Sequence, residues 1–510
     1  MASFFRWSIA NKVIPVLKKA SVNEEFLQPS VISTLVKVDR TPGHLPQLLI
    51  PFEKLKNASF QKNDLINPKE LVTLLRNQGL PTAEGFTDIT LDESSSSIKF
   101  TVDKHVFSKI ILMDICSNND ILFKNSCFFQ NIPQKNVLIE CWSPKIGEVF
   151  NMAHFRSAIH TNFIANINRI AGHDVTKTRH IKEFYFESAL LLTGFEYLGS
   201  TAEFLDKPCE HLSEVSKAAM SKYKNDLDFK DKVDYCSQAL QEDHSFNLSD
   251  WRYLQDLCTE QHYSIYKKIG LRYDDAHTDS SYFPKIEEVE KDLLRKNLIV
   301  IQDDGRVKVN INSDVEGDEN ISYNEMNSFL FHLSSRIFHA SYQKKRHDFD
   351  VMYYVAPTSE KKSFSLVNLL LKELGHDWAD NLHHIRLKNI SQLKGYKRGA
   401  EEIMNHAKVF LKRSLQKDLQ MQSVEAAEQI AETLSLSSLA IYDMKHRRNV
   451  DYDFTWKNIL SLGQNSGATL QLCHAGLLGL LEEADYKFNS DADTSPLSEP
   501  AAQNLIKHLA

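Results

Sequence analysis

The feature that most constrains this sequence is a buried-strand candidate followed by a loop and a helix, over residues 137–172. The strand is "VLIECW" (137–142), and a helix is predicted over 156–172. The apolar face of that helix consists of Ile159, Phe163, Ile167 and Ile170. A loop and a helix N-terminus that meet at the end of a parallel strand form the preferred anion site of an open α/β sheet. The connecting stretch, "CWSPKIGEVFNMAHFRSA", is therefore the first candidate for a functional site.

Further along the chain the same pattern recurs, which indicates an α/β domain. The strand "FDVMYYVAP" is followed by the helical segment "KSFSLVNLLLKELG". Between the two strand–helix units, residues 205–300 are predicted to be mostly helical, with "DWRYLQDLCTEQHYSIYKKIGL" as the clearest periodic segment. Gly172 stands where a helix C-cap glycine belongs. The middle of the chain therefore predicts a parallel sheet with a helical insertion.

The N-terminal part predicts a small α+β module over residues 24–133. It contains "LPQLLIPF", the helical "PKELVTLLRNQGL", and a hairpin made by "FTDITL" and "IKFTVD" around Asp92–Ser97. Residues 1–23 carry four basic residues and no acid. This composition is typical of a mitochondrial transit peptide, and it fits an ordinary first helix equally well. The two interpretations are compatible if only part of the segment is removed.

The C-terminal part is predicted to be helical over residues 399–488. Its helical segments are "GAEEIMNHAKVFLKRSLQKDL", "VEAAEQIAETLSLSSLAIYDM" and "SGATLQLCHAGLLGLLEEA". The stretch "NSDADTSPLSEP" has the composition of a linker, and "AAQNLIKHLA" begins one more helix.

Composition excludes several classes of protein. A formal net charge of -7 over 510 residues disfavours a chain that coats nucleic acid by bulk charge, although a regional basic face remains open. The seven cysteines are scattered and never spaced CxxC, which disfavours a disulfide framework and a thiolate zinc site. No apolar run reaches the length of a membrane helix. The adjacent His383 and His384 have no third ligand at metal spacing, so we expect no metal site there.

Several collinear segments resemble one known family, the class I arginyl-tRNA synthetases of the mitochondrial type. The resemblance runs from about residue 46 to the C-terminus and rests on "SPKIGEVFNMAHFRSAIHTNFIANINRIAGHDV", "LLLTGFEYLG", "FDVMYYVAPTSEKKSFSLVNLLLKELGHDWA", "YKRGAEEI" and "DYDFTWKNILSLGQNSGATLQLCHAGL". It implies a Rossmann-like catalytic domain with a helical insertion over 134–398, a helical domain over 399–488, and in 489–510 a linker and the start of a truncated anticodon-binding bundle. It also implies that the chain joins arginine to tRNA(Arg) with ATP, Mg²⁺ being the counter-ion of ATP.

The family's His-x-Gly-His tetrapeptide, which holds ATP at a helix N-terminus, corresponds to residues 151–154. The resemblance places Asn151 at the first histidine, Ala153 at the glycine, and keeps His154 as the second histidine. Asn151 and His154 are the catalytic candidates, and with Ala153 they are ATP-binding candidates. An Asn amide can donate a hydrogen bond to phosphate. It can equally serve as a helix N-cap.

Neighbouring positions match the family in part. Glu140 stands at the strand-end glutamate that takes the arginine guanidinium, and Ser143 begins the family's Ser-Pro-Asn. These two residues are the arginine-binding candidates. Glu148 replaces a lysine, and Lys145 is the candidate substitute in the ATP site. A buried Glu140 requires a cationic partner, which is either substrate arginine or an internal Lys or Arg.

Other family positions have changed. On the helix of "SFLFHLSSR", Leu330 is assigned to a tyrosine and Ser334 to an aspartate that contact arginine and adenosine. In the signature loop "QLKGYKRGA", Lys394, Lys397 and Arg398 are the remaining basic candidates for ATP.

Two functions follow from these observations. The first is a mitochondrial arginine–tRNA ligase, monomeric and located in the matrix, with the cytoplasm as the second choice. The second is an inactive paralogue that binds tRNA or a protein, because several site residues change together. Basic clusters in the last third, such as Lys445–Arg448, favour tRNA phosphates as a partner, although each alone is usually a solvated face.

Overall fold

The computed structural model forms two compact units. It describes residues 3–18, 28–59, 67–77, 85–116, 133–242, 248–279, 282–301, 307–310, 326–388, 390–391, 399–418, 423–460, 466–484 and 493–509. One unit comprises 1–133, 170–172 and 484–510, and the other comprises 134–169 and 173–483. Each unit is described by itself below. The predicted Lys394, Lys397 and Arg398 lie outside the described residues.

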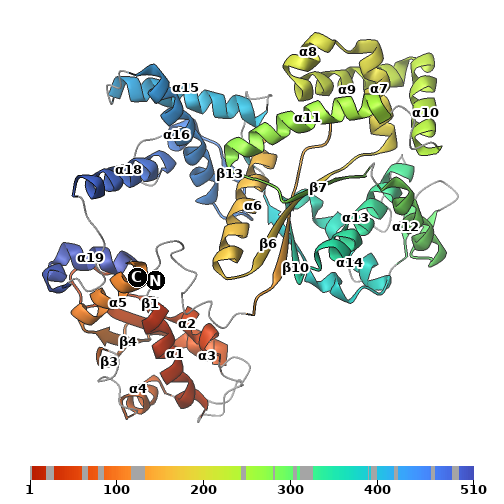
Figure 1. Ribbon diagram of the computed structural model, residues 1–510. Coiled ribbons are helices and arrows are strands. Elements are labelled where there is room, and N and C mark those ends of the chain that lie inside the picture. The colour runs from red at the N-terminus through yellow and green to blue at the C-terminus, as the bar shows by residue number, and fades with distance from the viewer. Residues whose placement is uncertain are drawn as a thin grey trace. The chain divides into compact units, whose positions relative to one another are not determined.

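The N-terminal unit is a small α+β module built on an antiparallel sheet of order β1-β2-β4-β3 (Figure 1). Its strands are β1 (Lys37–Val38), β2 (Gln47–Pro51), β3 (Phe86–Asp92) and β4 (Ser97–Val102). Its helices are α1 (Ser3–Lys18), α2 (Pro29–Leu35), α3 (Phe52–Ser59), α4 (Pro68–Asn77), α5 (Lys104–Cys116) and α19 (Pro500–Leu509). The predicted hairpin is confirmed, because β3 and β4 pair from Phe86↔Val102 to Asp92↔Ser97.

Helix α1 forms part of the core of this unit. Phe5, Ile9 and Val13 are fully buried, and the Phe5 ring stacks on Phe107 with their centroids 5.4 Å apart. Such burial stabilises by about 1.5–3 kcal/mol for each large apolar side chain. The basic N-terminal segment is therefore an integral helix of the unit as folded.

The last helix, α19, also packs on the N-terminal unit. Gln503 Nε2 donates to Ser108 Oγ on α5 at 2.9 Å. Lys507 Nζ donates to the carbonyl of Thr41 at 3.1 Å, and Ile506 joins the same apolar core.

The larger unit is built on a parallel five-stranded sheet of order β11-β10-β5-β6-β7. The strands are β5 (Asn136–Cys141), β6 (Asp174–Ile181), β7 (Asp275–Thr278), β10 (Val351–Pro357) and β11 (Leu382–Leu387). The predicted α/β class is thus confirmed. Chain order reverses between β5 and β10, and ligands bind outside the carboxyl ends of the strands at such a reversal.

Helices cover both faces of this sheet (Figure 1). Side chains alternate along a strand. Val137 and Ile139 accordingly pack with Ala165 of α6 (Met152–Ile170) on one face. Leu138 packs on the opposite face against α13 (Met326–His347) and α14 (Lys361–Glu373). Because Glu140 has the same parity as Leu138, its side chain faces α13.

The predicted apolar face of α6 is only partly correct. Ile159 is buried, but Phe163 and Ile167 are each 46% exposed. The buried stripe instead runs through Phe155 and Ala158, whose side chains meet the C-terminal helices. Gly172 ends the helix as predicted, with φ +86°.

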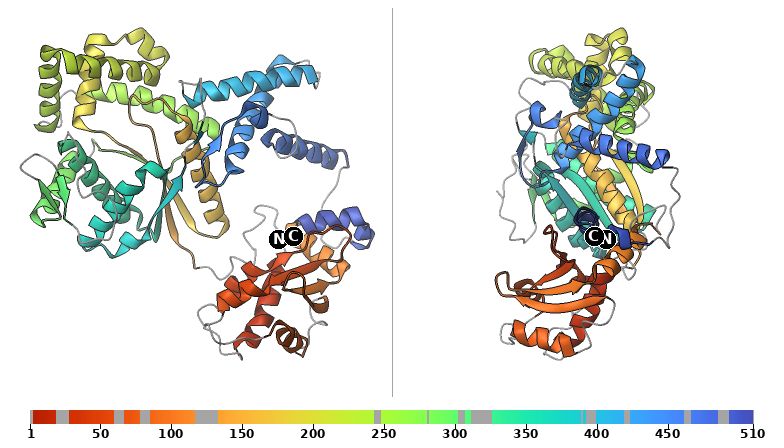
Figure 2. Two further views of the ribbon diagram at one scale, coloured as in Figure 1. Left: turned by 180° about the vertical axis from the view of Figure 1, so that it is seen from behind. Right: turned by 90° about the vertical axis from the view of Figure 1, so that its left-hand side faces the viewer.

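The helical insertion lies between β6 and β7 (Figure 2). Its helices are α7 (Tyr185–Leu198), α8 (Thr201–Asp206), α9 (Pro208–Asn225), α10 (Leu227–Glu242) and α11 (Leu248–Ile269). After β7 follow α12 (Phe283–Arg295) and the antiparallel pair β8 (Ile299–Ile301) and β9 (Val307–Val309). The mostly helical character predicted for this region is confirmed.

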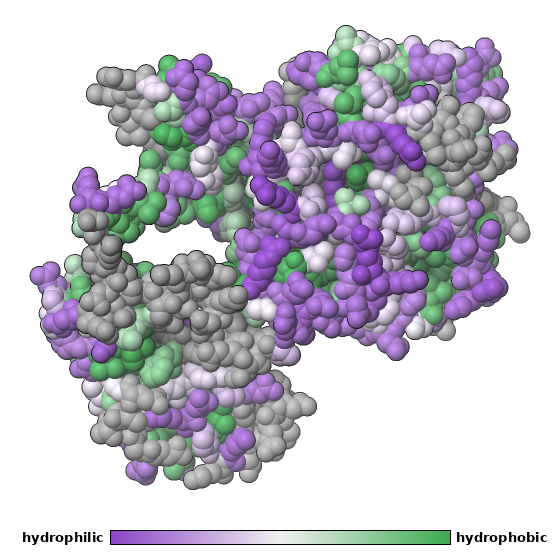
Figure 3. Space-filling view, in the orientation of Figure 1, coloured by the Kyte–Doolittle hydropathy of each residue, from purple (hydrophilic) through white to green (hydrophobic). Residues whose placement is uncertain are grey.

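The C-terminal helices follow the predicted segments. They are α15 (Ala400–Asp418), α16 (Val424–Met444), α17 (Trp456–Ile459) and α18 (Gly467–Glu483), with the short parallel pair β12 (Ile390–Ser391) and β13 (Tyr452–Asp453). Helix α18 carries exposed apolar side chains, seen as green atoms at the left of Figure 3. These are Leu470, Leu472, Leu477, Leu478, Leu480 and Leu481.

A buried ionic cluster joins α6 to α16. The Asp443 carboxylate forms ion pairs with Arg156 Nε at 3.0 Å and with His160 Nε2 at 2.9 Å. The Tyr452 hydroxyl donates a hydrogen bond to the same carboxylate. Arg156 is 1% exposed, and it also donates to the carbonyl of Lys388. The helix that begins at the candidate site is therefore fixed to the C-terminal helices by charge as well as by apolar packing.

Two predictions from composition can be compared with the structure. Among the helices of the described residues, none has both the length and the hydropathy of a membrane span. The described cysteines Cys141, Cys209, Cys236, Cys258 and Cys473 are free thiols.

Candidate active site

A pocket lies at the carboxyl ends of β5, β6 and β10, where the strand order reverses. The elements around it are these three strand ends together with α13 and α14. Its lining consists of Glu140, Cys141, Trp142, Ser143, His180, Lys182, Arg336, His339, Tyr354, Val355, Ala356, Phe364 and Val367. Charged and imidazole side chains make up one part of this lining, and apolar side chains make up the rest.

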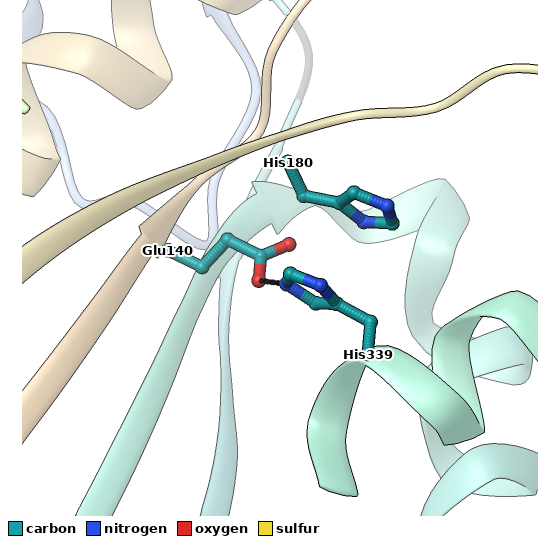
Figure 4. Close-up of side chains that lie close together, drawn as sticks. All are labelled: Glu140, His180 and His339. Carbon is teal, nitrogen blue, oxygen red and sulfur yellow. Dashed lines mark hydrogen bonds and ion pairs between the residues drawn. The ribbon is translucent and has the colours of Figure 1, made fainter. Parts of the chain in front are cut away.

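Glu140 is the carboxylate that the sequence singled out, and the structure gives it an internal partner. Its Oε2 accepts a hydrogen bond from His339 Nε2 at 2.8 Å (Figure 4). Burial raises the pKa of Glu140, but His339 and then His180 outweigh it, so the pKa is held below its ordinary value. Burial lowers the pKa of His339. The carboxylate therefore has an imidazole as its partner, which is neither of the two kinds predicted.

A second buried carboxylate supports this pair. The His180 ring stacks on the His339 ring, with centroids 3.9 Å apart and planes at 9°. His180 Nε2 lies 2.8 Å from Asp279 Oδ1, which also accepts from Ser335 Oγ at 2.6 Å. Burial raises the pKa of Asp279, but its charged and hydrogen-bonded partners, His180 first, lower it to about 2. The two histidines are thus fixed between two ionised carboxylates.

Two further cations lie in the pocket. Arg336 pairs with Glu360, donates to Ser363 Oγ at 2.5 Å, and holds its guanidinium carbon 5.1 Å from the centre of the Phe364 ring. Lys182 Nζ lies 3.8 Å from the same glutamate. Burial, and next the Arg336 guanidinium, lowers the pKa of Lys182 to about 8. The pocket therefore already contains one guanidinium bound by a carboxylate, a hydroxyl and an aromatic face.

The cluster of Glu140, His180 and His339 could be considered for a metal, because one ligand atom of each lies within 4.8 Å of the others. The two imidazoles are almost parallel, however, so their planes do not converge on one ion. Each of the three residues already has a hydrogen-bond partner, and Lys182 adds positive charge beside them. The arrangement is that of a hydrogen-bonded network.

The N-terminus of α6 is capped by its own asparagine. Asn151 Oδ1 accepts from the backbone N–H groups of Ala153 at 2.9 Å and His154 at 3.2 Å. This is the geometry of an N-cap. The amides predicted to face a phosphate are therefore satisfied internally in this structure.

His154 is fully buried at the same helix end. Its ring stacks on Trp142, with centroids 4.3 Å apart, and its Nδ1 accepts from the Asn151 N–H at 3.1 Å. Its Nε2 makes no hydrogen bond and lies 3.7 Å from Glu148 Oε1. Burial lowers the pKa of His154 well below its ordinary value, and burial raises the pKa of Glu148. His154 is thus a neutral imidazole covered by an indole ring.

The remaining predicted residues of the loop have local partners. Lys145 Nζ lies 2.8 and 3.0 Å from the two carboxylate oxygens of Glu187. Ser143 lines the pocket, donates to the Cys141 carbonyl at 3.2 Å and accepts from Tyr266 at 3.4 Å. Glu140 and Ser143 are thereby brought together in the pocket, whereas Lys145 is directed to the helical insertion.

The two residues of α13 that the resemblance assigned to the site do not line the pocket. Leu330 packs in the apolar core below the sheet, and the fully buried Ser334 Oγ makes no hydrogen bond. The side chains of α13 that line the pocket are Arg336 and His339. They follow one another at helical spacing, but nothing in the linear sequence distinguishes them from surface residues of a basic helix. The sequence analysis also missed Lys182, which directly follows the last residue of β6.

Comparison with known proteins identifies the class to which this fold and this pocket position belong. Residues 118–456, more than half of the chain, match the family described as tRNA synthetases class I (R), catalytic domain. The chain therefore belongs to this family, the class I tRNA synthetases (R).

Relatives and solved structures agree with this family. Proteins named "Probable arginine--tRNA ligase, mitochondrial" are 25% identical over 416 residues in Mus musculus, and 26% identical over 417 residues in Homo sapiens. Both alignments cover 81% of this chain and 72% of the relative. The arginyl-tRNA synthetase of Thermus thermophilus has a TM-score of 0.72 at 15% identity, covering 99% of this chain and 86% of that chain. The resemblance noted from the sequence is thus confirmed.

Proposed function

We propose that the chain is an arginine–tRNA ligase that uses ATP to charge mitochondrial tRNA(Arg). The observation that carries the proposal is the ionised Glu140 carboxylate at the end of β5, inside a pocket at the strand-order reversal of a class I synthetase fold. The name of the relatives supplies the substrate. A buried carboxylate is suited to a guanidinium, which it can bind through two parallel hydrogen bonds.

Arginine binding requires an exchange of partners at Glu140. His339 makes one hydrogen bond with Glu140, whereas a guanidinium donates two in parallel and brings a full charge. Substrate arginine can therefore replace His339, whose ring keeps its stacking on His180. Arg336 has its own carboxylate in Glu360, so its charge is partly neutralised when the substrate enters.

ATP is assigned to the N-terminus of α6, because a helix N-terminus favours phosphate. Rotation of the Asn151 side chain out of its cap would free the amides of Ala153 and His154 for the triphosphate. Displacement of Trp142 would expose the His154 Nε2–H as a further donor. Lys145 is a further ATP candidate, as are Lys394, Lys397 and Arg398, and Mg²⁺ enters as the counter-ion of ATP.

The mitochondrial matrix is the proposed location. The relatives are named mitochondrial, and the N-terminal segment is basic and free of acid. Because α1 contributes to the core of its unit, we expect most of this segment to stay with the protein after import. Arginine and tRNA(Arg) are the proposed partners, and a monomer is the proposed state.

The test is ATP-dependent charging of mitochondrial tRNA(Arg) with labelled arginine by the full chain. Charging is expected for the natural sequence. His154→Ala is expected to lower kcat, and Glu140→Gln is expected to raise KM for arginine by at least tenfold. Glu373→Gln, on an exposed carboxylate of α14, is the matched control and is expected to leave both constants unchanged.

A second candidate is a tRNA-binding protein that does not charge. The observations in its favour are the indole cover over His154 and the internal guanidinium in the pocket. It predicts no charging by the natural sequence, together with tRNA binding that weakens as salt rises. The same preparation therefore decides between the two.

A further inference from the structure

A second histidine cluster lies on the edge strand β7, next to the pocket, because the His277 ring meets the His339 ring edge-on with centroids 6.1 Å apart. Asp275 and His277 are two residues apart on this strand, so their side chains point to the same face. His347 is the last residue of α13, and it faces the same point. The cluster thus joins the edge strand of the sheet to the end of a helix that is 22 residues long.

The distances in this cluster are those of a ligand set. Asp275 Oδ2 lies 3.0 Å from His277 Nε2 and 3.2 Å from His347 Nε2. All three atoms lie within 4.8 Å of one another. Both Nε2 atoms are buried, and neither makes a hydrogen bond of good geometry. With metal–ligand distances of about 2.0–2.1 Å, ligand atoms of a tetrahedral zinc site lie about 3.3 Å apart.

The surrounding hydrogen bonds suit the same role. The Tyr282 hydroxyl lies 3.4 Å from His277 Nδ1, and the Ala276 N–H donates to Asp275 Oδ1 at 3.0 Å. Such outer contacts orient metal ligands.

A guanidinium now neutralises the carboxylate. Arg346 Nε donates to Asp275 Oδ2 at 2.5 Å, and its Nη1 lies 3.2 Å from the Tyr342 hydroxyl. The Arg346 side chain is 48% exposed, so it can turn into water without burying a charge. The side chains of Asp275 and His347 are also slightly exposed, which leaves room on one side for a water ligand.

We propose that Asp275, His277 and His347 bind one Zn²⁺ ion, with water as the fourth ligand and Arg346 displaced to solvent. Two imidazoles and one carboxylate form a donor set that zinc accepts. The ion would clamp β7 to the C-terminal end of α13. Its role is structural, because Asp275, His277 and His347 are not among the residues that line the pocket.

The proposal is tested on the full chain after removal of metal with a chelator. We expect about one equivalent of zinc to bind, and Co²⁺ to give the visible absorption of a tetrahedral site. His277→Gln and His347→Gln should each weaken binding at least tenfold. Arg346→Gln should bind zinc more tightly than the natural sequence, because a competing cation is gone. His383→Gln removes an exposed histidine and is the matched control.

Thermal unfolding provides the second measurement. Zinc should raise the unfolding temperature of the natural sequence and of Arg346→Gln, and should leave that of His347→Gln unchanged. His347 lies at the end of its helix, so its variant is expected to fold even if His277→Gln does not. The proposal is overturned if the natural sequence binds no zinc at micromolar concentration, or if both histidine variants keep its stoichiometry and affinity.

Discussion

Removal of the Asp443 carboxylate is the perturbation whose effect the structure defines best. Asp443 is 1% exposed and takes ion pairs from Arg156 and His160 and a hydrogen bond from Tyr452. In Asp443→Ala, the contacts left to the buried Arg156 guanidinium among the described residues are the Lys388 carbonyl and the nearby Tyr452 ring. An uncompensated buried charge is strongly unfavourable, and such a loss costs about 3–5 kcal/mol.

The expected change in thermal stability follows from this free energy. A large domain loses about 2 °C of unfolding temperature per kcal/mol, so Asp443→Ala should unfold about 6–10 °C lower. Differential scanning calorimetry of the full chain measures the shift. Asp451→Asn is the control, since this carboxylate is half exposed and lies 3.9 Å from Lys388. Exposed pairs contribute about 0–1 kcal/mol.

A double variant tests the cause. If the loss comes from the unpaired guanidinium, then Asp443→Leu combined with Arg156→Met should be more stable than Asp443→Leu alone, because apolar replacement of a buried ion pair is often neutral or stabilising. A loss in Asp443→Ala no larger than in Asp451→Asn would refute the reasoning. So would a double variant whose loss equals the sum of the two single losses.

Three further predictions concern separate parts of the chain. Burial, and next a neighbouring glutamate, raises the pKa of Glu290 to about 7, so its contribution to stability is present below pH 4.5 and is lost as pH rises to 7. Glu290→Gln should therefore raise the unfolding temperature at pH 8 and leave it unchanged at pH 4, and equal effects at both pH values would contradict this. In Gly467→Ala the new Cβ would lie 2.1 Å from the Ser437 carbonyl, so the unfolding temperature should fall. Gly476→Ala on the same helix meets no atom within 4 Å and should be neutral or stabilising by up to about 1 kcal/mol, and a loss as large as that of Gly467→Ala would refute the steric cause. Arg336→Gln removes an internal guanidinium from the pocket. In the charging assay it should lower the KM for arginine about tenfold, which corresponds to about 1.4 kcal/mol. An unchanged KM would mean that the Arg336 side chain does not compete with the substrate.

The charges of the pocket decide how the ligase and the second candidate differ. Glu140 has an internal donor that a stronger donor can replace, whereas Arg336 holds Glu360 at short range. A ligase requires that substrate arginine replace His339 at Glu140, and it can keep the pair of Arg336 and Glu360. A protein that only binds tRNA would keep both pairs permanently and would not charge, so a measurable KM for arginine that rises in Glu140→Gln separates these cases.

Local patterns in the sequence were sufficient for several of the elements. Alternation around Asp92–Ser97 predicted the hairpin of β3 and β4, and the apolar run at 137–142 predicted β5. Gly172 and Asn151 were recognised as helix-end residues, and they adopt these positions in the structure. These features depend on residues that are close in sequence, so short stretches specify them.

The sequence by itself therefore determined the family, the α/β class and the position of Glu140 at a strand end. Only the tertiary structure decided the partner of Glu140, because His339 is 199 residues away and on a helix with no distinguishing local pattern. It also decided that Trp142 covers His154. Phe163 is exposed in the structure, although the apolar periodicity of its helix predicted that it would be buried. The physical reason is the same in each case. Which side chains meet depends on how distant elements pack, and periodicity along one element carries no information about its neighbours.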